Sequence, residues 1–143
     1  MSTTAQWVFE TAMHLMDELA GTLADAAHTR EYKTRTPFIL NVLLDECASA
    51  SDTYKALQPG QRPICPPVES MEDELPLDDG VCRTVLPYGL AAQLYLQEDP
   101  VSARSWWDIF QENLALLSAA RPARVEDIAD VYGGIEHGRY GKW

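Results

Sequence analysis

The fold is decided by residues 73–100, which read DELPLDDGVCRTVLPYGLAAQLYLQEDP. Asp78 or Asp79 stands where a helix N-cap is expected, and apolar residues then recur at helical spacing. Pro87 interrupts this helix, while Gly89 leaves one side small enough for a second helix to approach closely. The stretch contains no catalytic nucleophile motif, phosphate loop or metal cluster. Its predicted core face consists of Val81, Val85, Leu86, Gly89, Ala92 and Leu96.

A further helix is predicted to begin at Asp99-Pro100, with aspartate as N-cap and proline in the first turn. It is expected to end at Arg121-Pro122. Trp106 and Trp107 point about 100° apart on such a helix. We expect one in the core and the other half-buried or at a partner, and shared burial is the favoured arrangement. The predicted buried stripe is Trp107, Phe110, Leu114 and Leu117.

Two more helices are predicted before this region. Thr3 and Gln6 have capping-box spacing, and Gly21 is the expected end of the first helix. Residues 24–28 are predicted to be a connection, so that the second helix begins at Thr29 or Arg30. Pro37 predicts a kink or a break in it. The apolar stripes are Val8, Ala12, Leu15, Met16 and Leu19 in the first helix, and Tyr32, Ile39, Leu40, Leu43 and Cys47 in the second.

A long irregular crossing, at about residues 50–78, is predicted between the second and third helices. It is rich in proline, and residues 62–65 are expected to form a short extended piece. A connection of this length is either functional or held by packing, and both remain open. Its second half contains six acidic residues and no basic one: Glu69, Glu72, Asp73, Glu74, Asp78 and Asp79.

The C-terminal residues 123–143 interleave glycines with large apolar side chains and have no helical period. Large aromatic residues are costly to expose, so this segment is expected to be an arm that docks on a partner. The predicted organisation is therefore a helical domain, residues 1–122, and an arm, residues 123–143. The predicted fold class is all-α, a small bundle of about four helices.

Composition limits the function classes. The 143 residues fit one domain, and a net charge of −11 does not support nucleic-acid binding through basic patches. Three widely spaced cysteines argue against a disulfide framework or a zinc site. The sequence shows no secretory signal and no apolar run of about 20 residues. We therefore expect that the protein does not associate with a membrane and that it is assembled in the cytoplasm.

Catalytic and metal-binding patterns are weak. His14, Asp17 and Glu18 fall within one helical turn, but no Glu-x-x-His pair is present to complete a helical metal site. A solvated face is the favoured interpretation of this group. His137 lies in the arm, where a contact is favoured over catalysis. The sequence predicts no enzyme, no metal and no cofactor.

Three motifs carry a resemblance to a known family. Residues 86–92, the Glu98-Asp99-Pro100 helix start and residues 130–135 together resemble the head–tail connector proteins, also called adaptor or head-completion proteins, of long-tailed bacteriophages and prophages. The similarity covers most of the chain beyond residue 29. It implies a helical subunit of a ring, commonly a dodecamer, that lies beneath the portal in the virion neck, extends the DNA channel and links head to tail.

The resemblance also implies two sets of functional residues. The arm would bind the portal, and aromatics spaced by glycines suit such a groove. Acidic residues facing the channel would let DNA pass without adhering. The arm residues expected at the portal are Tyr132, Gly133, Gly134, Ile135, Arg139, Tyr140 and Trp143. The residues expected in helix packing are Leu86, Pro87, Gly89, Ala92, Trp107 and Phe110.

Other functions compete with the connector. A small acidic regulator could bind a basic host protein or mimic DNA, but it would not need an aromatic arm, which favours the connector. A metal-dependent enzyme built on His14 ranks last. Among neck proteins, terminators and stoppers are usually rich in sheet, so the helical periodicity favours an adaptor. The loop around Pro66-Pro67 is longer than the family pattern suggests.

Overall fold

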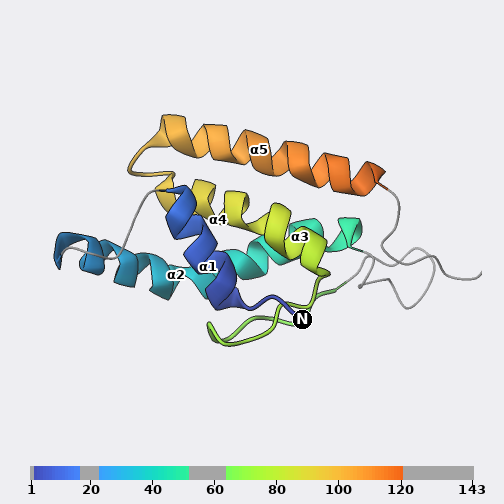
Figure 1. The fold of residues 1–143 in the computed structure, drawn as a ribbon, viewed down its shortest axis with the longest axis horizontal. Helices are drawn as coiled ribbons and strands as arrows, with labels where there is room; N and C mark the ends of the chain where they lie inside the picture. The colour runs from blue at the N-terminus through green and yellow to red at the C-terminus, as the bar shows by residue number, and fades with distance from the viewer. Residues whose placement is uncertain (1, 17–22, 52–63, 121–143) are drawn as a thin grey trace, which may run out of the picture.

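The computed structural model describes residues 2–16, 23–51 and 64–120 (Figure 1). These ranges contain α-helices and one 3-10 turn, and no strand runs through them. The prediction of a small all-α bundle is therefore confirmed. The elements are α1 (Ala5–Leu15), α2 (Leu23–Cys47), η1 (Ala48–Ala50), α3 (Asp79–Thr84), α4 (Leu86–Tyr95) and α5 (Pro100–Ala119).

The centre of the bundle is α4, which contacts α1, α2, α3 and α5 (Figure 1). Leu86, Leu90 and Ala91 are fully buried, and Leu94 is 1% exposed. A helix that is apolar around most of its circumference is stable only when other elements surround it. The sequence of α4 therefore requires its central position, with α5 along one side and α1 and α2 along others.

The helix predicted to run through Pro87 is instead two helices, α3 and α4. Val85 ends the first and precedes the second, with φ −111° and ψ −52°. Pro87 lacks an N–H and suits the first turn of a helix, so the chain restarts there. The core face is confirmed at five of its six positions. Leu96 is 54% exposed because α4 ends at Tyr95.

The predicted caps of α3 and α5 are confirmed. The Asp78 carboxylate accepts a hydrogen bond from the Val81 N–H at 3.3 Å. The Asp99 carboxylate accepts one from the Ser102 N–H at 3.2 Å and one from the Ser102 hydroxyl at 2.6 Å. The last helix ends at Ala119, two residues before the predicted end.

The expected start and end of the first helix were both wrong. Thr4 is the N-cap, because its hydroxyl accepts from the Trp7 N–H at 3.2 Å. Thr3 is engaged elsewhere, since its carbonyl accepts from the Leu75 N–H at 2.8 Å. The helix stops at Leu15, and Met16, which follows as its C-cap, remains buried. Residues Leu19 and Gly21 lie outside the described residues.

The second helix is longer than predicted. It begins at Leu23, so residues 24–28 are helical and not a connection, as their three alanines favour. The helix also continues through Pro37, so the break allowed by the sequence analysis does not occur. Its stripe is confirmed, with Tyr32, Leu40, Leu43 and Cys47 buried and Ile39 partly buried.

The described part of the crossing, residues 64–78, is irregular and held by packing. The Asn41 side chain makes two hydrogen bonds with the Val68 backbone, at 3.1 and 2.7 Å. The Met71 carbonyl accepts from the Gln6 N–H at 2.8 Å. The short extended piece was expected at residues 62–65. Of these, the structure describes Ile64 and Cys65, and they form no strand. The side chains buried from this segment are Val68, Met71, Leu75 and Leu77.

Candidate functional site

Gly89 lies where α5 and α2 both pack closely against α4. A Cβ atom added there would lie 2.8 Å from Phe110 Cδ2 and 3.1 Å from Leu43 Cδ2. The first distance is shorter than real Cβ contacts, so only glycine lets α5 and α2 approach α4 this closely at that level. The predicted small face of this helix is therefore buried on both sides.

The predicted packing residues meet at this contact. Leu86, Pro87, Gly89, Ala92 and Phe110 are buried, as expected. Trp107 is partly buried, and its ring centroid lies 4.7 Å from that of Phe110.

The two adjacent tryptophans share partial burial, which was the favoured arrangement. The ring centroid of Trp106 lies 5.3 Å from that of Tyr95, while Trp107 packs against Phe110. The expectation that one of them is fully in the core was wrong, because Phe110 occupies that position on α5.

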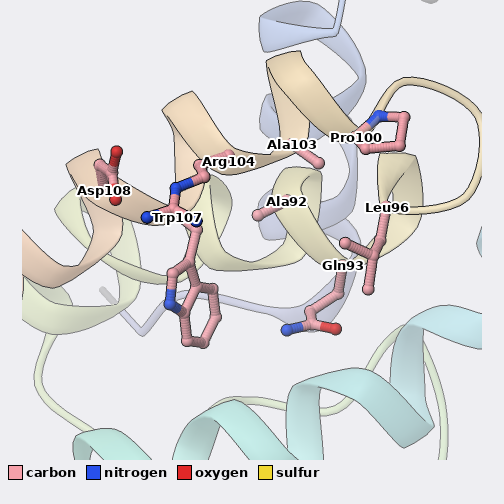
Figure 2. Close-up of a pocket in the computed structure, with 8 residues that line it drawn as sticks. All are labelled: Ala92, Gln93, Leu96, Pro100, Ala103, Arg104, Trp107 and Asp108. Atoms are coloured by element: carbon pink, nitrogen blue, oxygen red, sulfur yellow. The ribbon is translucent and has the colours of Figure 1, made fainter.

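A surface hollow of about 600 Å³ lies between α4 and the first half of α5 (Figure 2). Gln93, Leu96 and Trp107 extend into it toward the side on which α2 lies. Because Leu96 is exposed and Trp107 only partly covered, the hollow presents apolar surface to its surroundings. Its remaining lining residues are Ala92, Pro100, Ala103, Arg104 and Asp108.

A polar contact joins α2 to the turn between α4 and α5. The hydroxyl of Tyr32, a side chain only 1% exposed, donates to the Glu98 carboxylate at 2.5 Å. The Tyr32 ring also faces that of Tyr95 at 6.5 Å. The helix start that carries part of the connector resemblance is thus fixed to the second helix by a hydrogen bond that the sequence did not indicate.

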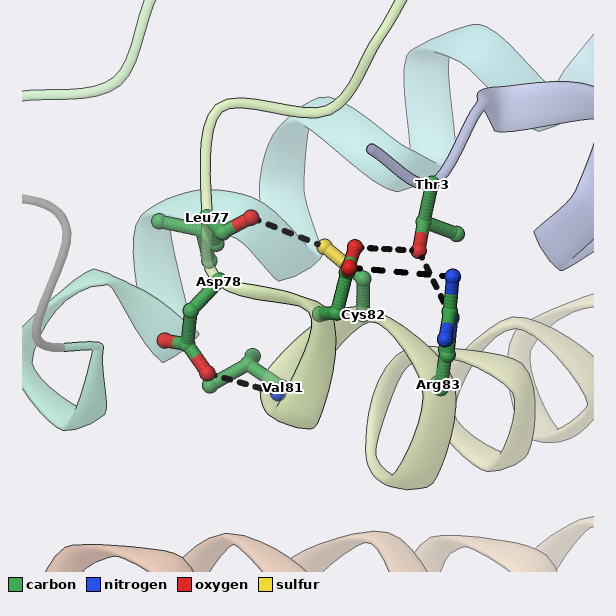
Figure 3. A network of polar contacts seen from close by, with 7 residues as sticks. Thr3, Leu77, Asp78, Val81, Cys82 and Arg83 are labelled. Carbon is green, nitrogen blue, oxygen red and sulfur yellow. Dashed lines mark hydrogen bonds and ion pairs between the residues drawn. The ribbon is translucent and has the colours of Figure 1, made fainter. Parts of the chain in front are cut away.

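Several residues of the acidic segment have structural roles (Figure 3). The Thr3 hydroxyl donates to Asp79 at 2.7 Å and accepts from Arg83 Nε at 3.1 Å. The Ser51 hydroxyl donates to Asp78 at 2.6 Å. These hydrogen bonds join the residues just before α1 and just after η1 to the start of α3. The carboxylates of Asp78 and Asp79 therefore serve the fold.

Two carboxylates of this segment, Asp73 and Asp79, and the Asp99 cap of α5 have lowered pKa values. Hydrogen bonds from Ser70 and Glu69 lower the pKa of Asp73, and hydrogen bonds from Ser102 lower that of Asp99. The Thr3 hydroxyl lowers the pKa of Asp79. Since each folded-state pKa lies below its ordinary value of 3.8, the charged forms stabilise the fold above that pH, and the contribution is lost as pH falls through the lowered values.

Asp99→Asn is expected to reduce this acid sensitivity. Asparagine caps a helix about as well as aspartate but does not titrate in this range. The melting temperature of Asp99→Asn should therefore fall less than that of the parent between about pH 5 and pH 2. Glu112→Gln, at an exposed position on α5, is the matched control. An identical acid dependence in the parent and Asp99→Asn would contradict a stabilising role for the Asp99 charge.

The cysteine thiols are free and poorly suited to nucleophilic chemistry. Burial is the main cause that raises the pKa of Cys47, and likewise that of Cys82, to about 12. Burial also raises the pKa of Cys65, which is partly exposed. A thiol with a raised pKa is protonated at neutral pH and reacts slowly.

The remaining candidate residues are placed as follows. His14 is exposed on α1, while Asp17, Glu18 and His137 lie outside the described residues. Within the described ranges, no group of three potential ligands could hold a metal ion, and no helix is both long and apolar enough to cross a membrane. All seven arm residues expected at the portal also lie outside the described residues.

Two exposed apolar residues were missed by the sequence analysis. Phe38 is 75% exposed and Val42 is 61% exposed, one turn apart on α2. The signal was present, because neither residue belongs to the buried stripe of that helix although both are large and apolar. Side chains of this kind on an acidic protein are candidates for contact with a partner.

Comparisons with known proteins found no matching family model, no similar curated protein and no similar solved structure. The connector resemblance therefore depends on the sequence motifs alone. The first of them, residues 86–92, forms the buried centre of the bundle, and the second forms the cap of α5. The third, residues 130–135, lies outside the described residues.

Proposed function

We propose that this protein is a structural connector of a phage or prophage virion, an adaptor subunit that forms a ring beneath the portal and links head to tail. The proposal includes its localisation in the neck, its partners, which are the portal and a downstream neck protein, and a channel through which DNA passes without specific binding. No membrane and no catalytic step are part of it.

The observation that carries the proposal is the division of apolar residues between core and surface. Residues 86–92, which carry the main motif, are packing residues at the centre of the bundle. Around them, large apolar side chains remain exposed on α2 and α5 and at the turn that precedes α5. A subunit of a larger assembly needs both a rigid core and uncovered apolar surface for its neighbours. The exposed residues are Phe38, Val42, Leu96, Val101 and Leu116.

The charge of the chain supports the same proposal. Glu69, Glu72 and Glu74 are exposed on the segment that precedes α3, and none of the three contributes to the caps described above. Carboxylates on the wall of a channel repel the phosphate backbone and so prevent DNA from binding tightly as it passes. The structure of the ring decides which of these residues would face the channel.

The test is attachment to the portal protein encoded by the same phage or prophage. The full chain is mixed with purified portal, and the product is separated by size and viewed by electron microscopy. We expect a ring of this protein on one end of the portal, with a subunit number equal to or commensurate with that of the portal. If the chain and the portal do not bind each other even at concentrations well above those at which virion proteins assemble, the proposal is contradicted.

The exposed glutamates favour a second function, that of an acidic regulator which binds a basic host protein. In that case, binding would depend on Glu69, Glu72 and Glu74 together and would weaken steeply with salt. Changing all three to glutamine should abolish such binding but leave portal attachment intact if the connector proposal holds. The triple variant therefore separates the two functions.

A further inference from the structure

The outer face of α2 carries an ordered series of side chains. Arg35 comes first, then Phe38 and Val42, and then Asp45. Phe38 and Val42 are 75% and 61% exposed, Asp45 is exposed and Arg35 is partly exposed. Along this face Arg35 flanks the apolar pair on one side and Asp45 flanks it on the other, and Glu31, also exposed, lies one turn before Arg35.

Helical geometry places these four residues together. With about 100° per residue, they fall within an arc of about 80° and span about 15 Å along the axis. The opposite side of the helix carries the buried stripe that includes Tyr32, Leu40 and Leu43. In the described part of the chain, no other element covers the Phe38 and Val42 side chains, which leaves this face open to a partner.

We propose that this face binds the same face of a second copy of the chain, with the two α2 helices antiparallel. In a twofold arrangement centred at the level of residue 40, residues whose numbers add to 80 lie opposite each other. Arg35 then faces Asp45 of the second copy, and Phe38 faces Val42 of the second copy. Each pair occurs twice, as an isologous contact requires.

Charge complementarity selects this occupant and this direction. Antiparallel helices bring Arg35 of each copy to Asp45 of the other, while parallel helices would place Arg35 beside Arg35 and Asp45 beside Asp45. The apolar residues lie at the centre with charged residues at the rim, which is the usual arrangement of a specific interface. A contact of this length is small, so we expect a dissociation constant of roughly 10–100 µM.

This pairing goes beyond the proposed connector function and does not depend on it. A twofold contact is satisfied by two copies, whereas a ring needs a head-to-tail contact between different surfaces. The dimer is therefore a separate association state of the free subunit. A full chain that attaches to the portal but does not dimerise would overturn only the pairing. A full chain that dimerises but does not attach to the portal would overturn only the connector.

Charge reversal tests the pairing by sedimentation velocity of the full chain. Arg35→Glu and Asp45→Arg should each weaken self-association roughly tenfold or more, because like charges then face each other. An equimolar mixture of the two variants should associate again, since each copy supplies the charge that the other lacks. The double variant Arg35→Glu/Asp45→Arg should recover association on its own for the same reason.

The apolar centre is tested separately. Phe38→Glu should abolish association, while Val101→Glu, at a position that is 80% exposed on α5, should leave it unchanged. Circular dichroism of each variant checks that the helices are retained. A wild-type chain that stays monomeric at about 100 µM would overturn the proposal. So would single reversals without effect, or an assembly of more than two copies that requires Phe38.

Discussion

Replacement of Gly89 by leucine is expected to lower the free energy of unfolding by about 3 kcal/mol. Already the first carbon of the new side chain would overlap the Phe110 ring, at 2.8 Å, and press against Leu43 at 3.1 Å. Neither helix can withdraw without losing core contacts, because Phe110 and Leu43 are themselves buried. The melting temperature should fall by about 10 °C in a chain of this size.

A matched control removes the general effect of adding a leucine to a helix. Ala115→Leu, at an exposed position on α5, should change the melting temperature by no more than about 2 °C. Gly89→Ala gives an intermediate test, because alanine favours the helix by about 1 kcal/mol while its Cβ meets the same overlap. An unchanged melting temperature in Gly89→Leu would mean that the small face of α4 is open and that the helices do not pack as described.

A second substitution tests whether the stability lost on changing Gly89 comes from overlap with Phe110. Phe110→Leu removes the ring that Gly89→Ala would meet, so alanine at position 89 should cost less in this background than in the parent. Phe110→Leu alone is expected to cost about 1–2 kcal/mol, since it leaves part of the ring volume empty. Additive losses would mean that the two sites do not touch.

Local signals explain which parts of the fold could be predicted. The caps at Asp78 and Asp99, and the stripe of α2 that includes Leu40 and Leu43, depend on residues within a few positions of each other. Gly89 was also recognised correctly as a point of close approach, because a glycine on an apolar helical face has few other uses.

The errors came from contacts between distant residues. Thr3 was a plausible cap by spacing, but its carbonyl binds Leu75 and its hydroxyl binds Asp79, which left Thr4 to cap the helix. The partners of Asn41 and Tyr32 lie 27 and 66 positions away. No local pattern identifies such pairs.

The candidate site was predicted only in part for a related reason. The packing residues could be found because burial produces a helical period, which the sequence displays. Exposed apolar residues such as Phe38 and Val42 produce no period of their own and were missed. The arm residues were proposed from composition and from the resemblance, and they lie outside the described residues.

Deletion of residues 133–143 is expected to abolish attachment to the portal and leave the melting temperature within about 2 °C of the parent. The buried core described above lies entirely before residue 121, so the bundle should remain folded. The deleted segment contains Ile135, Tyr140 and Trp143, large apolar residues of the kind that anchor a bound peptide in a groove. Binding is measured by co-sedimentation of the variant with the portal.

The length of the arm and its side chains can be separated by a variant that keeps all 143 residues. Changing Tyr132, Tyr140 and Trp143 to serine preserves the reach of the segment but removes its aromatic groups. If these groups fill pockets on the portal, the triple variant should bind as poorly as the deletion, because truncation of aromatic anchors commonly costs about 2 kcal/mol or more each. Binding by the triple variant but not by the deletion would assign attachment to the backbone of the arm. Retained binding by both would place the portal contact on the helical domain, where the hollow beside Trp107 and the exposed Val101 are the next surfaces to change.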